Sequence, residues 1–154
     1  MQQGSEIIIS DTSCLIILYK IGELELLKAL SGKVVITKTI KKEFGKSLPD
    51  WIKIKSPSDN HYQHILEMDL DPGEASAIAL SLETDNAILI IDDLKGRKVA
   101  ERLGLRYSGT FGLILRAKQQ GIVTSIRPTL NKIRETNFRF SESLYEIILK
   151  DAKE

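Results

Sequence analysis

Short runs of aliphatic residues alternate with longer stretches of helical periodicity, and this alternation restricts the fold more than any other feature of the sequence. Three runs of about five residues are apolar almost throughout, which is typical of strands buried on both faces. They are residues 6–10 (EIIIS), 33–37 (KVVIT) and 87–91 (AILII). Strands that alternate with helices form βαβ units, so we expect an α/β fold of three layers (α/β/α), with a parallel sheet of four or five short strands in the middle.

Capping and helix-breaking residues indicate the remaining elements. Gly22 separates two consecutive helical patterns, and Asp71-Pro72-Gly73 is interpreted as a turn before an Ala-rich helix. We expect helices near residues 14–20, 23–30, 39–46, 59–69, 74–83, 94–103 and 111–120, two more within 129–150, and brief strands within 49–55 and 105–107. Tyr19, Trp51 and Phe111 are assigned to the core.

The length and composition fit one ordinary domain, which we place at residues 1–154, with a core over about 6–125 and C-terminal helices over about 129–150. The net charge of +1 excludes a globally basic protein, so nucleic acid would have to bind a local patch. The single cysteine, Cys14, excludes an internal disulfide. No apolar run is long enough to span a membrane, and Met1–Glu6 lacks the features of a signal peptide, so we expect a cytoplasmic protein.

Acidic residues follow two of the three clearest strands. Asp11 comes directly after Ile7–Ser10, and Asp92 and Asp93 come directly after Ile88–Ile91. Ligands of open α/β sheets bind at the carboxyl ends of the strands, near a topological switch point, so these carboxylates converge if the two strands are neighbours. Carboxylates packed together repel unless a cation neutralises them, and an oxygen-rich site suits Mg²⁺ or Mn²⁺. The alternative for each acid alone is a helix cap.

Two further acids lie on predicted helices. Glu43 is in the short helix after the second strand, among Lys41, Lys42 and Lys46, and alone it would be interpreted as a solvated surface residue. Glu74 opens the Ala-rich helix, where an acid is also favoured by the helix dipole. It is the spacing of the whole set that favours a common site.

The order of these motifs resembles the PIN-domain nuclease family, in particular short prokaryotic members. The resemblance covers about residues 6–125. The motifs that show it are the strand leading into Asp11-Thr12-Ser13, the helix with Glu43, the stretch GEASAIALS from Gly73, the strand ending in Asp92-Asp93 with LKGRKVAERLG after it, and GTFGLILRAK from Gly109.

The resemblance implies a divalent-metal-dependent ribonuclease and assigns roles to individual residues. Asp11, Glu43 and the acid after the strand 87–91 would bind metal, and the Ser13 hydroxyl would hold Asp11 or a water on the metal. The third acid of the family is usually Asp within a helix, whereas this sequence has Glu74. Successive residues point in different directions, so one of Asp92 and Asp93 is the ligand and the other caps the next helix. Asp92 is favoured, and both remain candidates.

Candidate substrate contacts follow the double aspartate. Lys95 and Arg97 could contact phosphate, or they could lie on a solvated helix face with ion pairs. Thr110 could donate a hydrogen bond to phosphate or to water on a metal, but its favoured interpretation is a helix N-cap.

Three hypotheses differ in class. The first is an endoribonuclease that cuts RNA with Mg²⁺ or Mn²⁺; the resemblance to the toxin half of toxin–antitoxin modules adds a small antitoxin protein and a homodimer as expected partners. The second is a catalytically weak or inactive module that binds RNA or protein, which the Glu74 departure keeps open. The third is a signalling receiver domain, which is disfavoured because receivers place an acidic pair after the first strand and Asp11 stands alone there.

Overall fold

A five-stranded parallel sheet organises the computed structural model, which describes residues 6–154. Residues 1–5, which belong to the expected domain and to the segment without signal-peptide features, lie outside the described residues. The strands are β1 (Ile7–Ser10), β2 (Lys33–Ile36), β3 (Ile52–Ile54), β4 (Ala87–Ile90) and β5 (Tyr107–Ser108). Their spatial order is β3-β2-β1-β4-β5, and every pair is parallel. The expected α/β/α fold and parallel sheet are confirmed.

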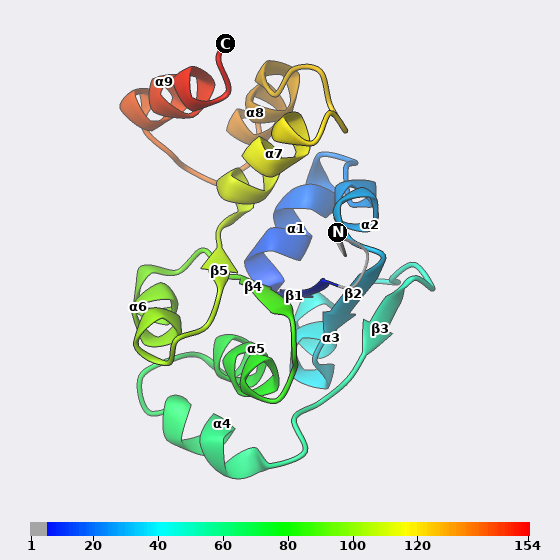
Figure 1. The fold of residues 1–154 in the computed structure, drawn as a ribbon, viewed down its shortest axis with the longest axis vertical. Coiled ribbons are helices and arrows are strands. Elements are labelled where there is room, and N and C mark those ends of the chain that lie inside the picture. The colour runs from blue at the N-terminus through cyan, green and yellow to red at the C-terminus, as the bar shows by residue number, and fades with distance from the viewer. Residues whose placement is uncertain (1–5) are drawn as a thin grey trace.

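Helices connect the strands and cover the sheet on both faces (Figure 1). They are α1 (Thr12–Lys20), α2 (Glu25–Leu30), α3 (Lys38–Phe44), α4 (Asn60–Leu66), α5 (Pro72–Leu82), α6 (Leu94–Arg102), α7 (Thr110–Gln119), α8 (Arg127–Arg134) and α9 (Glu142–Asp151). In Figure 1, α1, α2 and α7 lie above the sheet, α4 and α5 lie below it, and α6 lies to its left. Helix α3 contacts both α1 and α5. None of the helices within residues 6–154 is long and apolar enough to cross a membrane.

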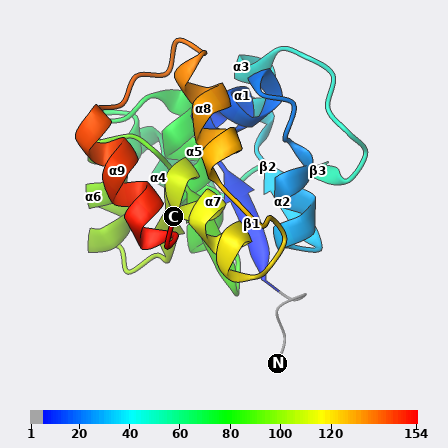
Figure 2. The ribbon, with the colours of Figure 1, turned by 90° about the horizontal axis from the view of Figure 1, so that it is seen from above.

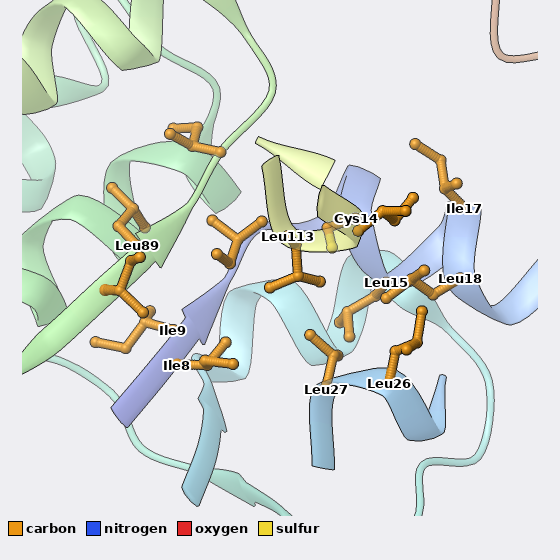
Figure 3. Packing of buried hydrophobic residues seen from close by; sticks show 14 of the residues in the cluster. Ile8, Ile9, Cys14, Leu15, Ile17, Leu18, Leu26, Leu27, Leu89 and Leu113 are labelled. Atoms are coloured by element: carbon orange, nitrogen blue, oxygen red, sulfur yellow. The ribbon is translucent and has the colours of Figure 1, made fainter. Parts of the chain in front are cut away.

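The core is built mainly from the aliphatic residues that define the strands and α1 (Figure 3). Ile8 and Ile9 of β1, Leu89 of β4, and Leu15 and Leu18 of α1 are fully buried. Burying each such side chain contributes roughly 1.5–3 kcal/mol, which fixes α1 on the sheet directly behind Asp11. Helices α7, α8 and α9 pack onto the same core through residues such as Leu113 and Ile133. Figure 2 shows the arrangement of these three helices.

Four local predictions need correction. Asp71-Pro72-Gly73 does not form a free turn, because Asp71 is the N-cap of α5 and Pro72 and Gly73 are its first residues. The last strand lies at Tyr107–Ser108 rather than 105–107, and α4 ends at Leu66, three residues before the expected 69. Tyr19 is not in the core: 45% of its surface is exposed.

Candidate active site

Asp11 lies at the switch point of the sheet, where β1 has β2 on one side and β4 on the other. Its carboxylate accepts two backbone hydrogen bonds: Oδ1 from the Cys14 amide at 2.9 Å, and Oδ2 from the Asp92 amide at 3.0 Å. The first bond makes Asp11 the N-cap of α1. The second ties the end of β1 to the end of β4, so the predicted convergence of the two strand ends is observed.

Burial of Asp11 has a marked electrostatic effect. Only 2% of the residue is exposed, and burial together with the nearby charge of Asp92 raises its pKa to about 7, against the two amide hydrogen bonds, which act to lower it. Within the described part of the chain, no lysine, arginine or histidine forms an ion pair with Asp11. Capping alone does not explain a carboxylate here, because Ser or Asn would accept the Cys14 bond without a charge; the second carboxylate oxygen accepts from the Asp92 amide.

The two consecutive aspartates have different surroundings. Asp92 accepts hydrogen bonds from the Thr110 amide at 2.8 Å and from the Thr110 hydroxyl at 2.6 Å, with a guanidinium nitrogen of Arg97 3.8 Å away. Asp93 is exposed and caps α6 by accepting a bond from the Gly96 amide at 3.1 Å. Asp92 is therefore the aspartate beside Asp11, and the helix cap is Asp93.

Glu43 reaches the same region from α3. Its Oε1 accepts from the Thr12 hydroxyl at 2.5 Å, and its Oε2 accepts from the Gly73 amide at 3.2 Å. A Cβ atom at position 73 would overlap the Glu43 carboxylate, so Gly73 is required for this close approach. Sequence reasoning missed both Thr12 and Gly73 as partners.

Glu74 lies in the first turn of α5, and other acids surround it. Its pKa is raised to about 7 by partial burial and then by the charges of Asp71 and Asp93, with Glu43 as a smaller contributor. Glu74 therefore shares one region of negative potential with Glu43 and Asp93. This is the observation that separates it from an ordinary first-turn acid, which would be solvated.

The acids meet in small groups rather than around one point. Among residues 6–154, no three His, Cys, Asp or Glu side chains lie close enough together, as they are placed, to hold a metal ion. The donor set itself fits a hard divalent cation, since it consists of carboxylate oxygens. A carboxylate offers about four lone-pair sites, and the two hydrogen bonds on Asp11, and those on Asp92, leave acceptor capacity on each.

The predicted substrate-binding residues are placed unevenly. Ser13 is exposed and does not hydrogen-bond Asp11, whose hydrogen bonds come from the Cys14 and Asp92 amides. Lys95 is exposed on α6, while the Arg97 Nε donates to the Ile91 carbonyl at 3.0 Å. Thr110 is not an N-cap, which corrects the favoured interpretation: Gly109 holds that position, and the buried Thr110 hydroxyl is bound to Asp92.

Cys14 is fully buried among the aliphatic side chains of the core, as Figure 3 shows. Burial raises the pKa of its thiol, with the charges of Asp11 and Asp92 acting in the same direction. A thiol in this state is a poor nucleophile, so the chemistry of the site rests on the acids.

Two comparisons with known proteins bear on this arrangement. A protein-family model described as a PIN domain matches residues 7–154. A search of curated proteins found no match.

Proposed function

The chain belongs to the PIN-domain family, and from that premise we propose that it is a divalent-metal-dependent endoribonuclease that hydrolyses RNA phosphodiester bonds. PIN domains are generally nucleases and typically use divalent metals. For this chain we assign Mg²⁺ or Mn²⁺ as the metal and RNA as the substrate.

The observation that supports this assignment best is the Asp11–Asp92 pair. Asp11 is buried at the end of β1, its pKa is raised to about 7, and Asp92 at the end of β4 is the neighbouring charge that contributes to this rise. A buried, unneutralised acid costs stability in the absence of a ligand. That cost is offset when a divalent cation binds, which is the reason such an arrangement is typical of metal sites.

We assign separate tasks to the residues around this pair. Asp11 and Asp92 would hold the metal, with Asp93 as the alternative to Asp92, and Glu43 and Glu74 would complete the acidic set from α3 and α5. The chemistry that a bound divalent cation supplies is neutralisation of charge on the phosphoryl group and a lower pKa for an attacking water.

The remaining residues position the acids or meet the substrate. Thr110 orients Asp92 through its amide and hydroxyl groups. Arg97 donates a hydrogen bond to the Ile91 carbonyl, and its guanidinium group lies at the edge of the acidic region, beside Asp92. In our proposal Arg97, Lys95 and the exposed hydroxyl of Ser13 contact the phosphates of RNA.

We extend the proposal to the biological setting that the family resemblance suggests. The protein would act in the cytoplasm as the toxin of a toxin–antitoxin pair, inhibited by a small antitoxin protein, and it would form a homodimer. Residues 1–154 would make one domain.

Cleavage of a labelled RNA in Mn²⁺ tests the activity. We expect Asp11→Asn to lower the cleavage rate by at least about 100-fold, the usual cost of losing a central electrostatic group. Asp85→Asn is the matched control, because Asp85 is exposed and precedes β4, at the end of that strand opposite to Asp92. Wild-type protein that binds RNA without metal and never cleaves it would refute the enzyme and favour a binding module.

A further inference from the structure

Helix α3 has two functional faces. At 100° per residue, Lys38, Lys41, Lys42 and Lys46, the last just beyond the helix, lie on the outer side and are all exposed; we call them the α3 lysine face. Ile40 and Phe44 lie on the opposite side and are buried. Glu43 lies on the flank and points to Thr12 and Gly73. One short helix therefore connects a cationic surface to the acidic site.

The charges of the α3 lysine face are not neutralised within the described residues, where none of the four ammonium groups forms an ion pair. Lys38 and Lys42 are four residues apart, a spacing at which like charges destabilise a helix. The helix dipole favours Lys41 and Lys42 in the last turn but disfavours Lys38 at the first position. Helix stability therefore does not explain the whole set.

The surface around these lysines has the features of a nucleic-acid site. The four lysines line an open hollow of about 640 Å³, together with Thr39 and Gly45. Tyr19 lies at its border: its ring packs edge-on against Phe44, and the Lys46 ammonium is 5.7 Å from the ring centre. An exposed aromatic ring beside a row of cations is the combination that binds single-stranded nucleic acid, by stacking one base while the cations follow the backbone.

We propose that the α3 lysine face and Tyr19 bind a stretch of single-stranded RNA beside the scissile position and lead it to the acids. The inference rests on the proposed function for the identity of the polymer. A protein partner fits less well, because protein interfaces are anchored by apolar and aromatic side chains and are depleted of lysine, whereas the hollow is lined by lysines, a threonine and a glycine. Helix α3 is about 10 Å long, at 1.5 Å per residue over Lys38–Phe44, and Lys46 follows its end, so the row can meet more than one phosphate.

Binding of a fluorescein-labelled oligouridine, followed by anisotropy in EDTA, tests this surface without cleavage. Each phosphate contact to a single strand contributes about 0.7 to the slope of log K against log salt. We expect the double variant Lys38→Gln/Lys42→Gln to reduce the slope by about 1.4, and at 0.1 M salt to weaken binding by roughly 25-fold. Its thermal stability should equal or exceed that of wild type, since a repulsive pair is removed.

The matched control is Lys28→Gln/Lys150→Gln, which changes the net charge equally at exposed sites on α2 and α9. We expect the control to bind within about twofold of wild type, and equal weakening in both variants would overturn the proposal. So would a Lys38→Gln/Lys42→Gln variant that binds RNA normally but loses affinity for polyglutamate, which would assign the face to an acidic protein segment.

A third variant, Tyr19→Leu, tests the stacking component while it keeps an apolar cover on Phe44. We expect roughly fivefold weaker binding or more, with the salt slope unchanged, because the lost interaction is uncharged. Wild-type affinity in this variant would remove Tyr19 from the site. The binding assay remains informative even if no cleavage is found in Mn²⁺, so failure of the RNA surface and failure of the nuclease are separate results.

Discussion

Replacing Asp11 by asparagine should make the metal-free protein more stable at neutral pH and less stable in acid. The pKa of Asp11 is about 7 in the folded protein, against an ordinary value of 3.8. Between these values the unfolded chain has released a proton that the folded chain still binds, so the free energy of unfolding of wild type falls as the pH rises from about 4 to 7. At 1.36 kcal/mol for each pH unit between the two pKa values, the loss is about 4 kcal/mol.

Asparagine removes this loss but introduces another. An amide has one acceptor oxygen, so it can accept from the amide of Cys14 or of Asp92 but not from both, and its NH₂ group then faces a second donor. Such a mismatch costs about 1–3 kcal/mol and does not depend on pH. The variant should therefore be less stable than wild type by about 1–3 kcal/mol near pH 4 and more stable by a similar amount near pH 8.

Urea unfolding in EDTA, followed by the fluorescence of Trp51, measures both curves, because Trp51 is the sole tryptophan. We expect the free energies of unfolding to cross between pH 4 and 7. The raised pKa of Glu74 affects wild type and variant alike, so it largely cancels in the difference. Mn²⁺ at pH 8 should reverse the order at 1,000 times the dissociation constant, where binding to the native state stabilises wild type by about 4.1 kcal/mol. A difference that stays constant from pH 4 to 8 would refute the electrostatic reasoning.

Two further substitutions test the supports of the site, and a third tests the buried acid at the other end of β1. Gly73→Ala should displace the Glu43 carboxylate from the Gly73 amide and lower Mn²⁺-dependent cleavage, but should cost less than about 1 kcal/mol of stability, because the overlapping atoms are the end of a flexible side chain. In a Glu43→Ala background the same change should stabilise by up to about 1 kcal/mol, because alanine is the better helix former; urea unfolding of the four proteins decides. Thr110→Val should lower the free energy of unfolding by about 1–2 kcal/mol and should lower the rate of Mn²⁺-dependent cleavage, because it removes the hydroxyl that binds Asp92. Thr110→Ser keeps this hydroxyl and should retain most of the stability and of the cleavage rate. Glu6→Gln should lower the free energy of unfolding by about 1.5–3 kcal/mol at pH 7. The difference from wild type should shrink as the pH falls below 4.5, because two arginines hold the pKa of Glu6 below that value and the stability they provide is lost when Glu6 is protonated. Acid unfolding monitored by circular dichroism measures this difference.

Most of the fold follows from local sequence signals. Continuous apolar runs such as Ile7–Ile9 and Ile88–Ile91 indicate strands because a parallel sheet buries both faces, and Gly22 and Gly45 have the positive φ angles that end helices. The boundaries that failed have a physical cause. Pro72-Gly73 alone indicates a turn, but Asp71 followed three residues later by Glu74 is the pattern of a capped helix start with proline at the first position.

The acids of the site were also accessible to sequence reasoning, but their supports were not. Asp11 and Asp92 are predictable as candidates because each directly follows a strand. The bond from Thr110 to Asp92 spans 18 positions, and the bond from Thr12 to Glu43 spans 31. Such contacts depend on the packing of separate elements and have no periodic signal in the chain. A glycine at the second position of an Ala-rich helix was the single available sign that another group approaches Gly73.

Two buried acids at opposite ends of β1 have different partners, and the difference bears on our proposal of a metal at Asp11. Glu6, at the amino end, binds Arg106 and Arg116, and its pKa is lowered. Asp11, at the carboxyl end, is held by backbone amides, and its pKa is raised. Within residues 6–154, arginines form ion pairs with the Glu6 carboxylate, and no cationic side chain does so with that of Asp11. Amide donors fix the direction of the Asp11 oxygens while leaving their charge available, which is the state that an external cation requires.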